Sequence, residues 1–178
     1  IVKNVRREIP LKDWQCTYVP HGINEDMYFP IRDGHEQLEE MNKWFDENTG
    51  GSELDFIIFY NNRNIRRKQP SDIIIAFRTF CEMLTPEQAD KCMLLMHTQP
   101  KDPNGTDLPE IANQLGGGHR IAFSGKKLDT KFLNFLYNKA SVTINIASNE
   151  GFGLGTCESL MAGTPILVNV TGGLQDQC

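Results

Sequence analysis

The stretch SVTINIASNEGFGLGTCESLMAGTPILVNV, from Ser141 to Val170, decides how this chain folds. It begins and ends with near-continuous hydrophobic runs of strand length, Ser141 to Ala147 and Pro165 to Val170. Strands that are buried on both faces of a parallel sheet have such uninterrupted apolar runs. Between the two runs lie a glycine-spaced loop and a short helical segment over residues 156–162, which Gly163 ends. The stretch therefore predicts a strand–helix–strand unit.

The same alternation extends toward the N-terminus. Three further apolar runs of strand length precede the stretch: Asp55 to Tyr60, Lys91 to His97 and Arg120 to Ser124. Helical segments separate them, over residues 71–84 with Ser71 as N-cap, 108–115 and 130–140. Alternating strands and helices are typical of a parallel sheet with helices on both faces. We therefore predict an α/β, Rossmann-like fold with five strands.

The first fifty residues have a different character. They contain the turn-forming segment VPHGINEDMYFP and the charged, helical segment GHEQLEEMNKWFDENTGG. We predict an approach or hinge segment over residues 1–50 and a Rossmann-like nucleotide-binding domain over residues 51–178. The chain has 178 residues and begins with Ile1. That is about one domain's worth of sequence. Because the sequence begins with Ile1 instead of methionine and ends at Cys178, just after a Gly-Gly turn, we expect a piece of a longer protein.

Composition excludes several classes of partner. The chain is 39% hydrophobic and 23% charged, with a net charge of −5, which is typical of a globular domain. An acidic chain does not favour nucleic acid or anionic membrane surfaces. No apolar run approaches the roughly 18 residues of a membrane-spanning helix, so we expect a cytoplasmic protein without a transmembrane segment. The five cysteines have no zinc-ligand or paired spacing.

The loop SNEGFGLGT, from Ser148 to Thr156, is the first candidate site. Ligands of open α/β sheets bind outside the carboxyl ends of the strands. This loop leads directly into a helix, whose first backbone N–H groups and dipole favour an anion. It lacks the dinucleotide fingerprint, because Thr156 stands where the last glycine is needed, and no G-K-[ST] follows for a Walker loop. We therefore predict a phosphate-binding site of another kind.

Two acids, Glu150 and Glu158, flank the glycine-spaced turn of this loop. Glu158 alone is compatible with a first-turn acid that caps the helix and complements its dipole. Glu150, in contrast, lies in the loop with no helix to cap. Two hydrogen-bond acceptors beside a phosphate site can hold the hydroxyls of a ribose and of a hexose. The pair favours a nucleotide-sugar site.

The loop after the first strand carries a basic cluster made of Arg63, Arg66, Arg67 and Lys68. Such a cluster is either a solvated charge run or, at the carboxyl end of a central strand, a diphosphate-binding group. Arginine supplies a planar fork and lysine a point charge, both of which suit a diphosphate. Three histidines are expected near the same edge: His21, His97 and His119. We assign none of them a catalytic role.

These motifs resemble the C-terminal nucleotide-binding domain of retaining GT-B glycosyltransferases of group 1, over about residues 19–174. The strongest element is Glu150, seven residues and Glu158, within EGFGLGTCESLMAGTPILVNVTGG. The segments VPHGIN, NNRNIRRK and FSG with LYNKASVTINIAS occur in the family's order. The chain departs from the family pattern at Asn62, where glycine is usual, and at Ser159, where alanine is common.

The resemblance implies one half of a GT-B fold that binds a UDP- or GDP-sugar for retaining transfer by a hexosyltransferase-type enzyme. It implies that Arg63 and Lys68 bind the donor diphosphate and that Glu158 binds the ribose hydroxyls. Glu150 would hold the transferred sugar together with the backbone of Phe152, Gly153 and Leu154. The amides near Gly155 and Thr156 would bind the phosphates.

The resemblance also implies partners and a metal-free reaction. An N-terminal domain of the same protein, absent from this chain, would bind an acceptor that is a glycan, a lipid or a protein, so we expect the fragment alone to be inactive. No cofactor or metal is expected, because no D-x-D motif is present and the Arg63 and Lys68 charges can stabilise the departing diphosphate. One alternative is a non-catalytic nucleotide-sugar-binding or scaffold module. Another is an epimerase or phosphorylase on a related frame, which the glutamate pair makes less favoured.

Overall fold

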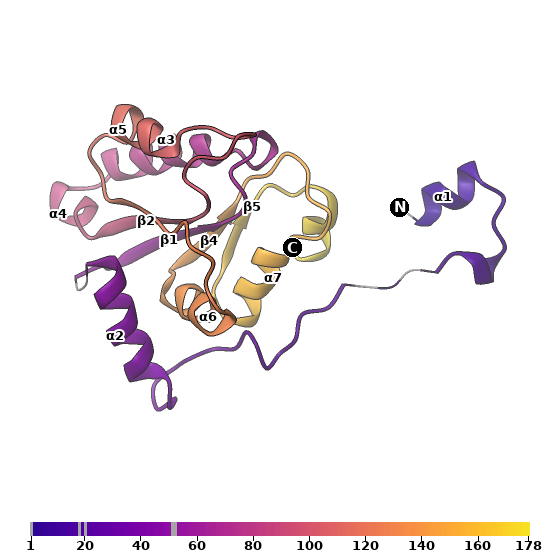
Figure 1. The fold of residues 1–178 in the computed structure, drawn as a ribbon, viewed down its shortest axis with the longest axis horizontal. Coiled ribbons are helices and arrows are strands. Elements are labelled where there is room, and N and C mark those ends of the chain that lie inside the picture. Colours follow the sequence, from indigo (N-terminus) through magenta and orange to yellow (C-terminus); the bar gives the residue numbers. More distant parts are fainter. Residues whose placement is uncertain (1, 18, 20, 51–52) are drawn as a thin grey trace.

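The computed structural model describes residues 2–17, 19, 21–50 and 53–178, without the side chains of residues 2–4. Five strands form one sheet in the order β3-β2-β1-β4-β5, and every neighbouring pair is parallel (Figure 1). The strands are β1 (Phe56–Asn61), β2 (Cys92–His97), β3 (Ile121–Phe123), β4 (Val142–Asn145) and β5 (Ile166–Val168). The predicted parallel α/β sheet is confirmed.

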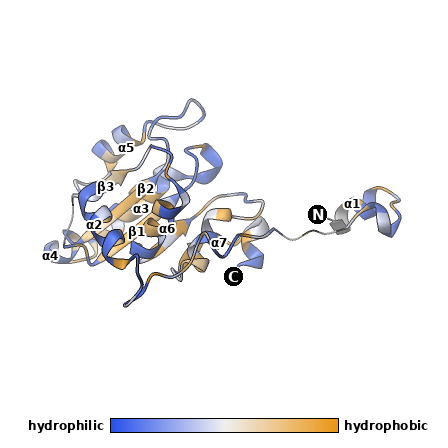
Figure 2. Cartoon of the chain, turned by 60° about the horizontal axis from the view of Figure 1, so that its bottom comes forward, coloured by the Kyte–Doolittle hydropathy of each residue, from blue (hydrophilic) through white to orange (hydrophobic). Residues whose placement is uncertain are grey.

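Helices cover both faces of the sheet. One face carries α3 (Pro70–Glu82), α4 (Pro86–Ala89) and α5 (Leu108–Leu115). The opposite face carries α2 (Leu38–Thr49), α6 (Thr130–Lys139) and α7 (Leu154–Met161). Figure 2 shows the hydrophobic strands between helices whose outer surfaces are hydrophilic. The two larger hydrophobic clusters thus lie at the two interfaces between this sheet and its helices. A third, smaller cluster contains Ile31, Met41 of α2 and Phe135 of α6.

Burial follows the position of each strand in the sheet. Along β1, Phe59 packs against the α6 side and Tyr60 against the α3 side, and both are fully buried. Side chains of a strand alternate between faces, so a central strand must be apolar on both. β5 differs, because it is an edge strand in which Leu167 is 58% exposed. The prediction that this last run is buried on both sides was wrong.

Two helix starts differ from the predicted ones. α3 begins at Pro70, so Ser71 lies in the first turn and is not the N-cap. Proline is favoured in the first turn, where a missing N–H costs nothing. α7 begins at Leu154 rather than at residue 156, because Gly153 takes a left-handed conformation with φ of 90° and serves as N-cap. Glu158 therefore lies beyond the first turn, and the interpretation of Glu158 as a first-turn cap was wrong.

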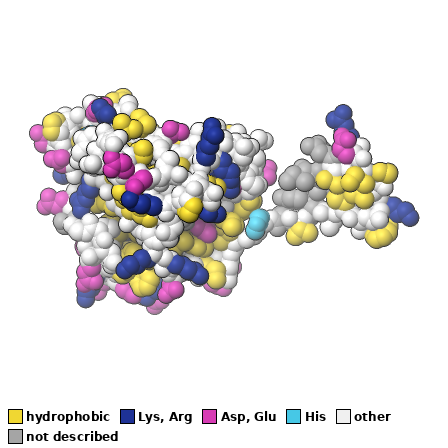
Figure 3. Space-filling model, turned by 45° about the horizontal axis from the view of Figure 1, so that its top comes forward, with side chains coloured by type: hydrophobic (Ala, Val, Ile, Leu, Met, Phe, Trp, Pro, Cys, Tyr) yellow, Lys and Arg dark blue, Asp and Glu magenta, His cyan; other side chains and the backbone are white. Residues whose placement is uncertain are grey.

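The N-terminal arm lies apart from the sheet and consists of α1 (Val2–Glu8) and the 3-10 turn η1 (Asp13–Gln15) (Figure 1). Figure 3 shows hydrophobic side chains gathered on this arm. Trp14, for example, is 79% exposed. Among the described residues, no helix combines the length and the hydrophobicity that crossing a bilayer requires.

The segment before residue 50 reaches the sheet through α2. Phe45 of α2 is buried beside Ile57 of β1, so this helix shares the second core. The boundary that we predict after residue 50 stays a prediction. Gly51, where the predicted domain begins, and Pro20, within the VPHGIN turn, lie outside the described residues.

Candidate functional site

A cavity of about 530 Å³ lies at the carboxyl ends of β1 and β4. Its walls come from the loop after β1, the loop after β4, the first turns of α7 and single residues of other segments. All the predicted site residues except Arg63 and Thr156 line it: Lys68, Glu150, Phe152, Gly153, Leu154, Gly155 and Glu158. The tertiary structure thus brings together residues from two distant parts of the chain at the edge where parallel sheets bind ligands.

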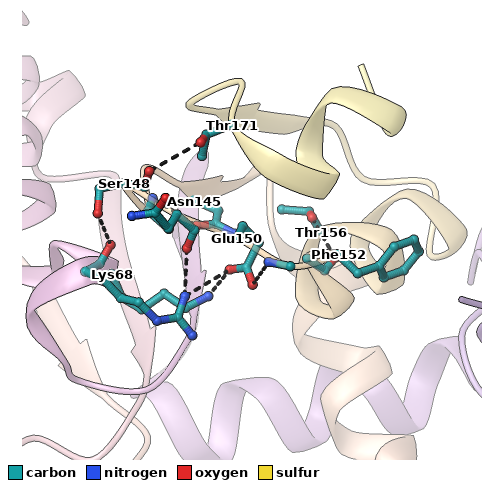
Figure 4. Close-up of polar contacts among 12 residues, drawn as sticks. Lys68, Asn145, Ser148, Glu150, Phe152, Thr156 and Thr171 are labelled. Atoms are coloured by element: carbon teal, nitrogen blue, oxygen red, sulfur yellow. Dashed lines mark hydrogen bonds and ion pairs between the residues drawn. The ribbon is translucent and has the colours of Figure 1, made fainter. Parts of the chain in front are cut away.

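Lys68 and Glu150 form an ion pair within the cavity (Figure 4). Lys68 ends the 3-10 turn η2 (Arg66–Lys68), and its side chain is 8% exposed, against 11% for Glu150. The other carboxylate oxygen of Glu150 accepts a hydrogen bond of 3.1 Å from the N–H of Gly151. Arg67 adds a second positive charge, with Nη1 at 3.9 Å from Glu150 Oε2. Glu150 is therefore a well-partnered acid at the wall of the cavity.

The protonation of Glu150 reflects these partners. Burial raises the pKa of this carboxyl, but the hydrogen bond and charge of Lys68 lower it, helped by Gly151 and Arg67. The net result is a pKa below the ordinary value of 4.5. Glu150 is thus an ionised hydrogen-bond acceptor at neutral pH.

Glu158 is held from beneath the cavity. Its Oε2 accepts a hydrogen bond of 2.7 Å from the hydroxyl of Tyr137, on α6. That hydroxyl in turn accepts a bond of 2.7 Å from Nδ2 of Asn61, the last residue of β1. Burial, followed by the negative charge of Glu158, raises the pKa of the fully buried Tyr137 well above its ordinary value. A neutral phenol therefore fixes one carboxylate oxygen of Glu158.

The start of α7 offers two backbone donors. The N–H groups of Thr156 and Cys157 both donate to the carbonyl of Gly153. Those of Leu154 and Gly155 make no hydrogen bond within the part of the chain that the structure describes. Two N–H groups without a partner at a helix start, together with the helix dipole, suit an anion.

Thr156 supports the loop rather than the cavity wall. Its buried Oγ1 lies 2.8 Å from the carbonyl oxygen of Gly153 and 2.6 Å from Oε1 of Gln177. The amide of Gln177 also donates to the carbonyl of Phe152, at 2.5 Å. Sequence reasoning missed Gln177, because a single glutamine after a glycine pair carries no recognisable signal.

Close packing requires glycine at positions 172 and 173. A Cβ at Gly172 would collide with the carbonyl oxygen of Glu150, and one at Gly173 with that of Gly151. In addition, the N–H of Gly173 donates to the carbonyl of Glu150 at 3.0 Å. The two backbones approach too closely for any side chain, so this contact holds the Glu150 loop in place.

Arg63 is placed away from the cavity. Its Nε and Nη2 lie 2.8 and 3.3 Å from the two carboxylate oxygens of Asp102, in the loop after β2. The Arg63 side chain is 61% exposed, whereas that of Asp102 is largely buried. The hydrogen bond from Arg63 is the main cause that lowers the pKa of Asp102. The structure thus brings Lys68 together with Glu150 and Glu158, and leaves Arg63 paired elsewhere.

His21 also lines the cavity, and it is one of the three histidines expected at this edge of the sheet. Its ring stacks on Phe152, with centroids 4.9 Å apart. In Figure 4 the ring of Phe152 extends away from Lys68. His97, in contrast, does not line the cavity, and its Nδ1 lies 3.0 Å from Oγ of Ser124. The place of His21 in VPHGIN, a motif of the family resemblance, is the sequence signal that distinguishes it from His97 and His119.

No group of three or more histidine, cysteine, aspartate or glutamate side chains suited to a metal lies together in the described residues. The cations that pair with Glu150 are Lys68 and Arg67. A metal-free site stays a prediction.

Comparison with known proteins identifies the family. The model of the family "Glycosyl transferases group 1" matches residues 42–178. The chain therefore belongs to this family. The predicted resemblance to one half of a GT-B glycosyltransferase is confirmed, and the α/β fold agrees with it.

Individual relatives are distant in sequence and similar in fold. The mannosylfructose-phosphate synthase of Agrobacterium fabrum is 24% identical over 168 residues, which cover 92% of this chain and 34% of that protein. The crystal structure of WaaG, a glycosyltransferase involved in lipopolysaccharide biosynthesis, matches with a TM-score of 0.72 and 18% identity, over 98% of this chain and 44% of WaaG. Anabaena HepE in complex with UDP-glucose matches with a TM-score of 0.66 and 15% identity, over 88% and 39%. The chain thus spans about a third of the mannosylfructose-phosphate synthase.

Proposed function

We propose that this domain binds the nucleoside diphosphate sugar, a UDP- or GDP-sugar, of a retaining hexosyltransferase. The observation that carries the proposal is the convergence of Lys68, Glu150, Glu158 and the α7 amides on one cavity. A cation and helix N–H groups suit a diphosphate, whereas two acidic side chains with hydrogen-bond acceptors suit sugar hydroxyls. Membership of the group-1 family and the UDP-glucose bound by HepE support the same donor class.

The proposed roles follow the geometry of the cavity. Lys68 and the N–H groups of Leu154 and Gly155 would bind the diphosphate. Glu158 would accept the ribose hydroxyls, and Glu150 those of the transferred sugar. In the reaction, the bond between the anomeric carbon and the diphosphate oxygen would break, and its electron pair would leave with the diphosphate. The acceptor oxygen would form the new bond to the anomeric carbon and lose its proton. Positive groups aimed at that developing charge lower the barrier, typically by about 3 kcal/mol each.

Arg63 would bind the diphosphate only after its ion pair with Asp102 breaks. The Arg63 side chain is 61% exposed, and a diphosphate carries more negative charge than the single carboxylate of Asp102. The exchange would leave the largely buried carboxylate of Asp102 with the N–H of Asn104 as its donor, so the diphosphate must outweigh the loss of Arg63. The acceptor, whether glycan, lipid or protein, would bind to a domain outside this chain. Turnover would then need that domain, and a cytoplasmic location stays a prediction.

Calorimetry with UDP and GDP tests the proposal. We expect one of them to bind, and we expect Arg63→Ala and Glu158→Gln each to weaken binding about tenfold, since a charged hydrogen bond contributes about 1.5–3 kcal/mol. Arg78→Ala is the matched control, because Arg78 pairs with Glu82 on the outer side of α3. Unchanged affinity in both site variants would refute the assigned roles. Donor binding without sugar transfer by the complete protein would support the binding-module alternative.

A further inference from the structure

The segment LYNKAS was part of the family resemblance, yet none of its residues has a role in the proposed function. Its Tyr137 is fully buried on α6 and reaches the underside of the cavity. We propose that Tyr137 is a positioning residue that orients Glu158 toward the ribose of the donor. This inference rests on the proposed function of the site.

The direction of the hydrogen bonds follows from the groups involved. The Nδ2 of Asn61 lies 2.7 Å from the hydroxyl oxygen of Tyr137, and an amide nitrogen can only donate. The single hydroxyl proton is then available for Glu158, whose Oε2 is also 2.7 Å away. A carboxylate can only accept, so both neighbours favour the same arrangement. Tyr137 thus presents a fixed donor to Glu158.

The phenol has little freedom to move. Its ring makes edge-to-face contacts with Phe59 and with Tyr28, at centroid distances of 5.1 and 5.9 Å. The carbonyl of Tyr137 accepts a hydrogen bond of 2.6 Å from the buried hydroxyl of Thr164. Ring and backbone are both fixed by the core of the domain, so the hydroxyl position is set by the fold.

Tyr28 places a second phenol in the neighbourhood of Glu158. Burial, followed by the charge of Glu158, raises the pKa of Tyr28 above its ordinary value. Among the described residues no ion pair involves Glu158, so its orientation comes from the hydrogen bond that the Tyr137 phenol donates. A carboxylate has about four acceptor positions, so the bond from Tyr137 leaves capacity for ligand hydroxyls.

The first turn of α7 closes directly over this hydrogen-bond chain. A Cβ built on Gly155 would lie 3.2 Å from the carbonyl oxygen of Asn61 and 3.3 Å from the hydroxyl of Tyr137. This contact therefore sets the position of two groups. One is the N–H of Gly155, which we propose binds the phosphates, and the other is Glu158, which we propose binds the ribose. Tyr137 links the two subsites at a fixed separation.

The test compares ribose-containing ligands with analogues that lack the hydroxyls. Calorimetry would use UDP, GDP and their 2′,3′-dideoxy forms with the wild type and with Tyr137→Phe. We expect Tyr137→Phe to weaken the ribose ligand about five- to tenfold and to leave the affinity for the dideoxy form within about twofold, the effect of one lost hydrogen bond. Asn61→Ala, which acts on the same hydroxyl from the other side, is expected to shift binding in the same direction.

Tyr60→Phe is the matched control. Tyr60 is also fully buried, but its hydroxyl has no hydrogen-bond partner among the described residues. We expect Tyr60→Phe to leave both affinities unchanged. If Tyr137→Phe weakens both ligands equally, or neither, Tyr137 is not a positioning residue for the ribose. If the wild type binds no nucleoside diphosphate at all, it is the proposed function that fails.

Discussion

Lys68 and Glu150 lie 82 positions apart in the sequence and form an ion pair in the cavity. Their loops follow β1 and β4, and these strands are neighbours although β2 and β3 come between them in the chain. The pair places a cation beside the acid that is proposed to hold the transferred sugar. A bound donor would therefore meet both charges at once, with the diphosphate at Lys68 and the sugar at Glu150.

The stability of the protein should depend on pH through Glu150. Its folded pKa lies below 4.5, so its ionised form stabilises the fold above that pH, and the contribution is lost as the pH falls through the folded value. We expect Glu150→Gln to lower the free energy of unfolding at neutral pH by about 1–3 kcal/mol, because Lys68 loses its partner. Urea unfolding between about pH 7 and pH 3 should show this difference shrinking. Glu36→Gln, at an exposed position, is the control. The prediction would be contradicted if Glu150→Gln lost no more free energy of unfolding than Glu36→Gln, or if its loss did not change with pH.

Gly155→Ala should weaken nucleoside diphosphate binding more than it changes stability. The added methyl would meet Asn61 and Tyr137 at 3.2–3.3 Å, so the first turn of α7 would shift by a few tenths of an ångström. We expect a loss of about tenfold in affinity, which corresponds to 1.4 kcal/mol. In Gly151→Ala, by contrast, the methyl would have no neighbour within 4 Å. Calorimetry that finds the two variants equal would show that the close contact at Gly155 does not matter.

Gly172→Ala should destabilise the fold strongly. Gly172 has a φ of 54°, and a Cβ there would collide with the carbonyl oxygen of Glu150. Gly118 has a φ of 79° but open space around its Cβ, so Gly118→Ala isolates the cost of the left-handed backbone, about 1–2 kcal/mol. We expect the loss in Gly172→Ala to exceed that of Gly118→Ala in chemical denaturation. Similar losses in both would mean that the Glu150 loop can move aside.

Asp102→Asn should strengthen nucleoside diphosphate binding about two- to fivefold. The substitution weakens the partner that holds Arg63. It keeps a side-chain oxygen that can accept from the N–H of Asn104, as Asp102 Oδ1 does at 2.8 Å in the wild type. The expected gain of two- to fivefold corresponds to less than 1 kcal/mol of binding free energy. The effect should disappear when Arg63→Ala is present. A gain that persists in the double variant would mean that Arg63 does not bind the diphosphate.

Part of the site could be predicted because it is local. The spacing of Glu150 and Glu158 around a glycine loop, directly after an apolar run, predicts a loop and helix start with two acids at its ends. The structure places both acids at one cavity. Where the helix begins could not be predicted, because the left-handed Gly153 depends on the packing of Leu174, Thr156 and Gln177 around it.

The sequence by itself determined the class of fold and the family, since apolar runs, turn residues and the glutamate motif are properties of short segments. Only the tertiary structure decided which charges meet. It paired Lys68 with Glu150 and Arg63 with Asp102, although both cations lie in the same basic loop. It also placed Tyr137 under Glu158. The physical reason is that strand order and helix packing set these distances. The local sequence around a residue does not specify which distant residue it will contact.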